Sequence, residues 1–198
     1  MARRLKCRAI GSSAIVPKLV HLIRHGQSTF NAAYAVDGID PLHFDARLTP
    51  LGLEQVAAAR AEAAHLAPEL IVVSPLTRAI QTAIGIFGDR PLLIEALHRE
   101  HGYSSCDVGR APAQLAAEFP HLAFDHLPEM WWHHGPDANE HGIAIEPIDR
   151  LTARVEDFRR WLIGRPEREI AVIGHGTFFW HLTGEKFENC QRRVLTFD

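Results

Sequence analysis

The sequence predicts an α/β fold, a three-layer α/β/α sandwich around a mostly parallel sheet, with an insertion near a ligand site. Short β-branched apolar runs alternate with longer segments of helical periodicity, and those runs lack the polar alternation of half-solvated strands. The 198 residues suit one domain, and 46% apolar and 23% charged residues are typical of a folded globular chain.

We expect one domain over residues 18–198, preceded by a poorly ordered extension at residues 1–17. The extension places Arg3, Arg4 and Lys6 before a mildly apolar stretch, which weakly resembles a signal or transit peptide. Glycine and serine interrupt that stretch, and no A-x-A cleavage site follows it. The extension is therefore interpreted as a frayed terminus.

The cysteine content bears on the cellular compartment, and the apolar runs and net charge bear on the classes of partner. Cys7, Cys106 and Cys190 are odd in number and far apart, which predicts a reducing, cytoplasmic location without a disulfide framework. No apolar run reaches membrane-span length, so we expect no membrane partner. The net charge of −3 is too small to attract nucleic acid by bulk electrostatics. Nothing in the sequence specifies an oligomeric state.

Five short segments have the composition of strands in this sheet. Three are β-branched runs, as expected for strands that helices cover on both faces, and two are weaker. The strong segments are 18–23 (KLVHLI), 69–73 (ELIVV) and 169–173 (EIAVI), and the weaker ones are 91–94 and 193–197.

Helices are marked by their first residues and by their spacing. Thr49 before Pro50 predicts an N-cap and a helix to about residue 66, and Ser74 before Pro75 predicts a second helix to about residue 87. Residues 147–163 carry apolar side chains at helical spacing. In contrast, the segment 101–146 is rich in His, Gly, Pro and Trp, with one helical patch near 113–119. We expect it to be an insertion over or beside the site.

The three strong strands all run into polar residues that a buried strand does not need. They are followed by Arg24-His25-Gly26, by Ser74-Pro75-Leu76-Thr77-Arg78, and by Gly174-His175-Gly176. Ligands of open parallel sheets bind outside the carboxyl ends of the strands, so we expect these groups to converge.

Two guanidiniums and two imidazoles at neighbouring strand ends predict a pocket for a phosphate-sized dianion. If Ser74 is an N-cap, Arg78 lies about one turn into its helix, where the helix dipole disfavours a cation unless an anion binds there. The planar fork of arginine binds phosphate oxygens bidentately.

The run 22–31 (LIRHGQSTFN) resembles the signature of the histidine phosphatase superfamily, the phosphoglycerate-mutase-like fold. Further matches occur in the order of that family and extend the resemblance over most of the chain from residue 18 to 184. They are 48–52 (LTPLG) with Gln55, 74–79 (SPLTRA) with Thr82, and 174–176 (GHG).

The resemblance implies that His25 is the nucleophile and carries a transient phosphohistidine. It also implies that Arg24, Arg78 and the catalytic residue His175 bind the transferred phosphoryl group. This agrees with the chemistry, because nearby guanidiniums favour a neutral imidazole and offset charge on the equatorial oxygens.

Further residues are expected at the site, each with an alternative role or a competing residue. Asn31 is expected to contact the phosphoryl group or to mark a helix start, and Gln27 and Ser28 are expected to bind phosphate or merely to cap and fill. The family places its proton donor after the strand that precedes the insertion, where Glu100 fits best and Glu95 competes. The segment 97–102 (LHREHG) departs from the mutase pattern L-N-E-R-H-Y-G.

The resulting expectation is a phosphatase that hydrolyses phosphate monoesters of small metabolites through a phosphohistidine, without metal or cofactor. The chain lacks H-E-x-x-H, zinc-like cysteine spacing, Walker A and G-x-G-x-x-G motifs. A mutase that returns the phosphoryl group to a second hydroxyl is the first alternative. A non-catalytic phosphate-ligand binder is the second, although the nucleophile and its clamp are all present.

Overall fold

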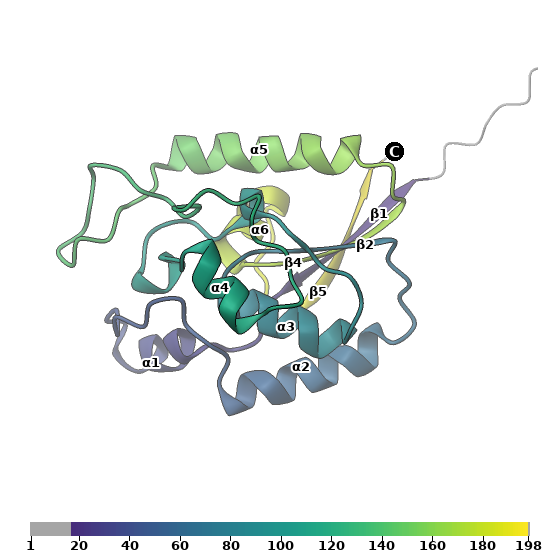
Figure 1. Cartoon of the computed structure of the whole chain (residues 1–198), viewed down its shortest axis with the longest axis horizontal. Coiled ribbons are helices and arrows are strands. Elements are labelled where there is room, and N and C mark those ends of the chain that lie inside the picture. Colours follow the sequence, from purple (N-terminus) through teal and green to yellow (C-terminus); the bar gives the residue numbers. More distant parts are fainter. Residues whose placement is uncertain (1–16, 198) are drawn as a thin grey trace, which may run out of the picture.

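The computed structural model describes residues 17–197 and contains one five-stranded sheet of order β3-β2-β4-β1-β5 (Figure 1). Four strands are parallel and β5 pairs antiparallel with β1 at the edge. The strands are β1 (Lys18–Arg24), β2 (Leu70–Val73), β3 (Leu93–Ile94), β4 (Glu169–Gly174) and β5 (Arg192–Phe197). The predicted extension lies outside the described residues, apart from Pro17, and the domain boundary stays a prediction.

Helices cover both faces of this sheet. They are α1 (Thr29–Asp37), α2 (Pro50–Ala63), α3 (Thr77–Phe87), α4 (Pro112–Glu118), α5 (Ile148–Gly164) and α6 (Gly176–Thr183), with 3₁₀ turns at Ala96–His98 and Ser105–Asp107. Figure 1 shows α5 on one side of the sheet and α2 and α3 on the other. The three-layer α/β/α prediction is therefore confirmed.

Separate apolar clusters bind each helical layer to the sheet. On one face, Leu151 and Phe158 of α5 and Phe178 of α6 pack on Val172. On the other face, α3 packs through Ile80 on neighbouring strands, and α2 packs beside it. Each fully buried aliphatic or aromatic side chain contributes about 1.5–3 kcal/mol, so these clusters fix the strand ends relative to one another.

Most of the predicted elements are confirmed, with small shifts at their ends. The side chain of Thr49 accepts a hydrogen bond from the Gly52 amide at 3.0 Å and caps α2, which ends at Ala63 rather than near residue 66. The weak strand at 193–197 is real and begins one residue earlier. It is the antiparallel edge of an otherwise parallel sheet.

The prediction that Ser74 caps a helix is wrong, because α3 begins three residues later at Thr77. The Ser74 amide continues the sheet by donating to the carbonyl of Ile173 at 3.1 Å, and extended backbone at Leu76 delays the helix. The carboxylate of Asp45 accepts from the Thr77 amide at 2.8 Å and caps α3 instead. The N-terminus of α3 is thus already occupied by an anionic side chain.

The predicted insertion contains one α-helix, one 3₁₀ turn and long loops. Trp131 within it is 3% exposed and donates its indole N–H to the carbonyl of Arg110 at 2.9 Å. Trp132 meets it edge to face, with ring centroids 5.5 Å apart. These tryptophans hold the insertion against the α3 face of the sheet.

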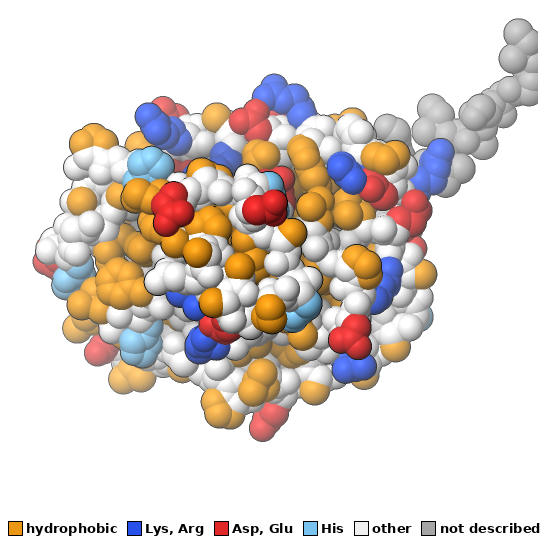
Figure 2. Space-filling view, viewed as in Figure 1, with side chains coloured by type: hydrophobic (Ala, Val, Ile, Leu, Met, Phe, Trp, Pro, Cys, Tyr) orange, Lys and Arg blue, Asp and Glu red, His pale blue; other side chains and the backbone are white. Residues whose placement is uncertain are grey.

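The surface carries charged side chains of both signs. On the face drawn in Figure 2 the basic and acidic groups are interspersed. Within residues 17–197, no helix is long and apolar enough to cross a membrane. Cys106 and Cys190 are free thiols.

Candidate active site

Three strand ends meet at one edge of the sheet, as the sequence predicts. Arg24 at the end of β1 lies opposite Gly174 of β4, and Val73 of β2 lies opposite Ile173. His25 and His175, here called the site histidines, follow these positions, and their ring centroids are 5.2 Å apart. Parallel pairing therefore joins residues separated by 150 positions in the sequence.

The hydrogen bonds of His25 define the tautomer of its ring. Its Nδ1 lies 2.7 Å from the carbonyl oxygen of Gly26, which accepts only, so Nδ1 carries the proton. Its Nε2 lies 3.2 Å from Nε of Arg78, which donates only. The lone pair of Nε2 therefore accepts the N–H of Arg78, a permanent cation.

Arg78 is 2% exposed and fixed by acceptors on the insertion. Its guanidinium donates to the carbonyl of Cys106 at 2.5 Å and to the carboxylate of Asp107 at 3.0 Å. Burial raises the pKa of Asp107 to about 6, against the opposing effect of Arg78. Asp107 is thus mainly ionised at neutral pH and offsets the charge that Arg78 brings to the first turn of α3.

His175 and Arg24 complete the cluster, and each has one buried nitrogen without a partner among residues 17–197. Nε2 of His175 lies 2.7 Å from Oγ of Ser74, while its Nδ1 makes no hydrogen bond. Arg24 donates from Nη1 to the carbonyl of Phe187 at 2.6 Å, while its Nε is unpaired. An unpaired buried polar atom is costly, which is typical of a site that a polar ligand completes.

Both site histidines are neutral at physiological pH. Burial is the main reason that their pKa values lie well below the ordinary value of 6.5, and the guanidinium of Arg78 lowers them further. Arg24 acts in the same direction. The sequence argument names the guanidiniums as the cause, whereas desolvation contributes more.

A cavity of about 320 Å³ opens at this edge, and we call it the strand-end cavity. Its size is near the lower end of the roughly 300–1,000 Å³ of small-molecule sites. The insertion forms part of its wall, as the sequence predicts. Its lining consists of Arg24, His25, Phe30, Asn31, Tyr34, Arg78, Glu100, His101, Tyr103, Ser104, Cys106, Asp107 and Thr177.

Glu100 lines this cavity, and Glu95 does not. The carboxylate of Glu100 accepts from the amides of Thr177 at 3.0 Å and Phe178 at 2.9 Å, in the first turn of α6. It also accepts from the His101 amide at 2.9 Å. Glu95 instead accepts from the Leu97 amide in a 3₁₀ turn. The geometry thus places Glu100, and not Glu95, in the cavity that His25 lines.

The start of α1 carries three predicted site residues, Gln27, Ser28 and Asn31, of which only Asn31 lines the cavity. Ser28 and Asn31 form a capping box, with Asn31 Oδ1 3.1 Å from the Ser28 amide, and Asn31 also faces the cavity. Gln27 accepts from Thr49 Oγ1 at 2.7 Å. Neither Gln27 nor Ser28 lines the cavity, so their direct contact with phosphate stays a prediction.

Sequence reasoning missed the segment before β5. Amides of this segment hold the backbone at the end of β1, because Cys190 donates to the carbonyl of Arg24 at 3.1 Å. The side-chain amide of Asn189 donates to the carbonyl of His25 at 2.9 Å. No motif signals these contacts, which form only because antiparallel β5 begins beside the end of β1.

The arrangement offers two cationic guanidiniums, two neutral imidazoles and one carboxylate around a single cavity. Within the described part of the chain, no cluster of His, Cys, Asp and Glu is arranged to hold a metal ion. The groups present suit an anion with several oxygens, next to an imidazole lone pair.

The chain belongs to branch 1 of the histidine phosphatase superfamily, which it matches over residues 20–196. An Arabidopsis thaliana phosphoglycerate mutase-like protein is 30% identical, over 87% of this chain and 76% of that protein. A glucosyl-3-phosphoglycerate phosphatase of Mycolicibacterium vanbaalenii is also 30% identical, over 82% of this chain and 71% of that protein.

Solved structures show the same fold. A crystal structure of a candidate alpha-ribazole-5′-P phosphatase from Escherichia coli has a TM-score of 0.65 and 22% sequence identity, and the match covers 91% of both chains. The resemblance predicted from the sequence is therefore confirmed at the level of family and fold.

Proposed function

We propose that this chain is a phosphatase that hydrolyses phosphate monoesters of small metabolites through a covalent phosphohistidine, without a metal. The observation that carries the proposal is the ring of His25, which lines the strand-end cavity and whose Nε2 is unprotonated and accepts from Nε of Arg78 at 3.2 Å. Membership of the superfamily supports it, as does the name of the mycobacterial relative.

In the first step, Nε2 of His25 gives up the hydrogen bond that it accepts from Nε of Arg78, and its lone pair attacks phosphorus. The bond from phosphorus to the ester oxygen breaks. The leaving oxygen takes a proton from the carboxyl group of Glu100. Arg24, Arg78 and His175 offset the charge on the equatorial oxygens, and Asn31 adds a contact. Each such donor contributes on the order of 10²–10³ in rate.

In the second step, a water molecule attacks phosphorus and gives its proton to the Glu100 carboxylate. The bond between phosphorus and Nε2 breaks, and its electron pair returns to His25. Inorganic phosphate leaves, and both catalytic groups regain their starting forms. The backbone amides that bind Glu100 hold its oxygens in one orientation through both steps.

The central test compares His25→Ala with the unchanged protein on p-nitrophenyl phosphate. The variant is expected to lose turnover by at least about 10³-fold, with an unchanged melting temperature, and the unchanged protein is expected to show a burst of alcohol release if the second step is slow. Retained turnover in His25→Ala rejects the nucleophile. A chelator is expected to leave activity unchanged.

Glu100→Gln tests whether Glu100 is the proton donor to the leaving group. The variant is expected to lose far more activity on alkyl phosphates than on aryl phosphates, because a phenolate leaves without full protonation. Glu95→Gln is the matched control and is expected to leave both rates unchanged. Equal losses on both substrate classes in Glu100→Gln contradict the assignment.

Intramolecular phosphoryl transfer is the alternative that uses the same core. It predicts that a substrate with a second hydroxyl gives a positional isomer instead of inorganic phosphate. A panel of phosphorylated metabolites, scored for both products, separates the two reactions.

A further inference from the structure

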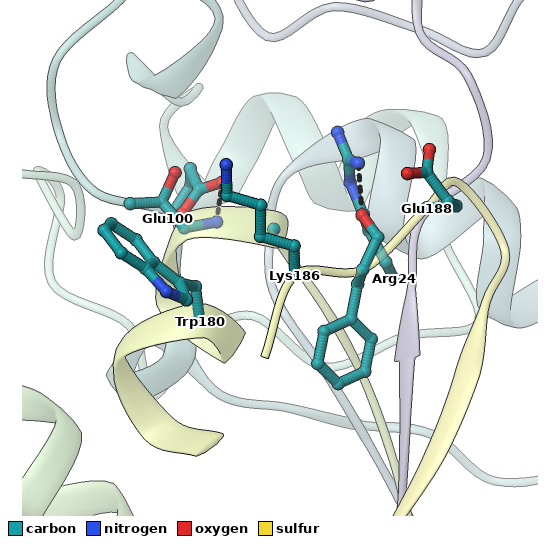
Figure 3. Close-up of a pocket in the computed structure, with 8 residues that line it drawn as sticks. Arg24, Glu100, Trp180, Lys186 and Glu188 are labelled. Carbon is teal, nitrogen blue, oxygen red and sulfur yellow. Dashed lines mark hydrogen bonds between the residues drawn. The ribbon is translucent and has the colours of Figure 1, made fainter. Parts of the chain in front are cut away.

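A second cavity of about 290 Å³ adjoins the strand-end cavity. We call it the indole cavity. Arg24, Glu100 and Thr177 line both cavities, so the two cavities share a wall. The remaining lining residues are Gly176, Trp180, Lys186, Phe187 and Glu188. Figure 3 shows Trp180 projecting from α6, and Lys186 and Glu188 from the segment that follows it.

Three side chains of the indole cavity are exposed rather than packed in the core. Trp180 is 46% exposed, although α6 buries Phe178 and Phe179. Lys186 and Glu188 are exposed, and neither side chain makes a hydrogen bond or ion pair with any of residues 17–197. The lining of the cavity thus offers a flat apolar surface, an ammonium group and a carboxylate to a ligand.

The charges around the indole cavity balance. Arg24 and Lys186 are cationic, whereas Glu100 and Glu188 carry carboxylates. A second anionic group on the substrate would meet these carboxylates as well as the ammonium of Lys186, so the cavity gives it no net attraction. A neutral group with many hydroxyls suits it, because each hydroxyl donates to a carboxylate or accepts from the ammonium.

We propose that the indole cavity binds the alcohol part of the substrate and that this part is a neutral polyol, a sugar above all. The proposal rests on the proposed function, since it places the transferred phosphate in the strand-end cavity. Sugar rings present C–H groups to the indole of Trp180 and hydroxyls to Lys186 and Glu188. Glu100 lies between the two cavities, beside the ester oxygen that it protonates.

The test compares kcat/KM for hexose 6-phosphates, phosphoserine, 3-phosphoglycerate and acetyl phosphate. Acetyl phosphate carries no ring and no hydroxyl group, so it reports on the strand-end cavity alone. The expected order places the hexose phosphates first among the metabolites. Trp180→Ala is expected to lower kcat/KM about five- to tenfold for the hexose phosphates and less than about twofold for acetyl phosphate.

Two further variants refine the test. Trp180→Tyr is expected to restore most of the activity on hexose phosphates, because it keeps a ring at that position. Lys186→Met is expected to lower their kcat/KM about tenfold. Arg160→Met is the matched control, since it also removes an exposed cation, on α5 and outside both cavities.

Three results overturn the proposal. Equal losses on hexose phosphates and acetyl phosphate in Trp180→Ala show a structural role for the indole. Unchanged kinetics in that variant show that the cavity is not used. A higher kcat/KM for phosphoserine or 3-phosphoglycerate, lost in Trp180→Ala, shows a charged alcohol part. These results leave the proposed function intact, which fails separately if His25→Ala still hydrolyses acetyl phosphate.

Discussion

The buried ion pair between Glu146 and Arg154 holds the loop that carries Glu100, and Glu146→Gln is the perturbation that measures this. Glu146 is 2% exposed and accepts from Arg154 Nε at 2.9 Å and Nη2 at 2.6 Å. Arg154 also donates to the carbonyls of Leu97 at 3.0 Å, Arg99 at 2.7 Å and Glu100 at 3.2 Å. One guanidinium from α5 thus fixes three backbone groups of the loop.

The expected loss in the free energy of unfolding follows from the burial of the ion pair. Breaking a buried pair by removing one partner costs about 3–5 kcal/mol, because the other charge stays buried. Glutamine keeps one acceptor oxygen, so we expect about 3 kcal/mol for Glu146→Gln. For a chain of this size, that lowers Tm by about 6–12 °C.

Lowering the pH should weaken the stabilisation that this ion pair provides. Burial alone raises the pKa of Glu146, but Arg154 and Arg99 outweigh it and hold that pKa below its ordinary value. A carboxyl group with a lowered pKa in the folded state contributes stability above its unfolded pKa and loses it as the pH falls. The difference in Tm between the variant and the unchanged protein should therefore shrink below about pH 4.

Thermal denaturation by circular dichroism measures the loss, and Glu156→Gln is the matched control. Glu156 lies on the same helix as Arg154 and pairs with Arg159 at 3.6 Å in an exposed position. An exposed pair contributes about 0–1 kcal/mol, so this variant should shift Tm by less than about 2–4 °C. A Tm change in Glu146→Gln no larger than in the control refutes the argument.

The remaining stability predictions concern contacts beneath the site. Gly52→Ala would place a Cβ 2.1 Å from the carbonyl oxygen of Gln27, so we expect a loss of both Tm and activity, whereas Gly164→Ala meets no neighbour and should raise Tm slightly. Asp45→Ala removes the cap of α3 and should lower stability by about 1–2 kcal/mol and reduce turnover, because Arg78 follows the capped residue. The site histidines have lowered pKa values, so the unfolded state binds more protons and folding stability should fall as the pH drops below about 6.5. Denaturant titrations from pH 8 to 5 should show this decline.

The fold and the meeting of the strand ends could be predicted because both depend on short-range patterns. Three apolar runs identify parallel strands, and parallel pairing brings the residues after them together whatever their distance in sequence. His25 and His175 meet for that reason. The candidate site residues can then be identified in the sequence, because a sheet does not need charged residues directly after its buried strands.

The contacts that could not be predicted join residues that only the tertiary fold brings together. A serine before proline is a general N-cap signal, yet Oγ of Ser74 lies 2.7 Å from His175 and the cap of α3 comes from Asp45. The anion that compensates Arg78 is Asp107, 29 residues away on the insertion. No periodicity records such a pair, so the sequence argument assigns the compensating charge to the substrate alone.

The charges of the site determine how strongly it attracts a dianion. Arg24 and Arg78 face the carboxylates of Glu100 and Asp107, so these four groups sum to zero when both carboxyl groups are ionised. A bound dianion would then face two carboxylates, of which Asp107 is neutralised by direct contact with Arg78 at 3.0 Å. The Glu100 carboxylate therefore carries the remaining repulsion toward a bound dianion.

Sulfate tests this repulsion, because it is a dianion that does not titrate near neutral pH. Calorimetric titration at pH 7 should show tighter sulfate binding by Glu100→Gln than by the unchanged protein, because the variant removes a carboxylate from the lining of the cavity. Glu95→Gln is the matched control, since Glu95 does not line the strand-end cavity, and it should bind sulfate as the unchanged protein does. Sulfate binding by Glu100→Gln that is no tighter than binding by the unchanged protein contradicts the argument.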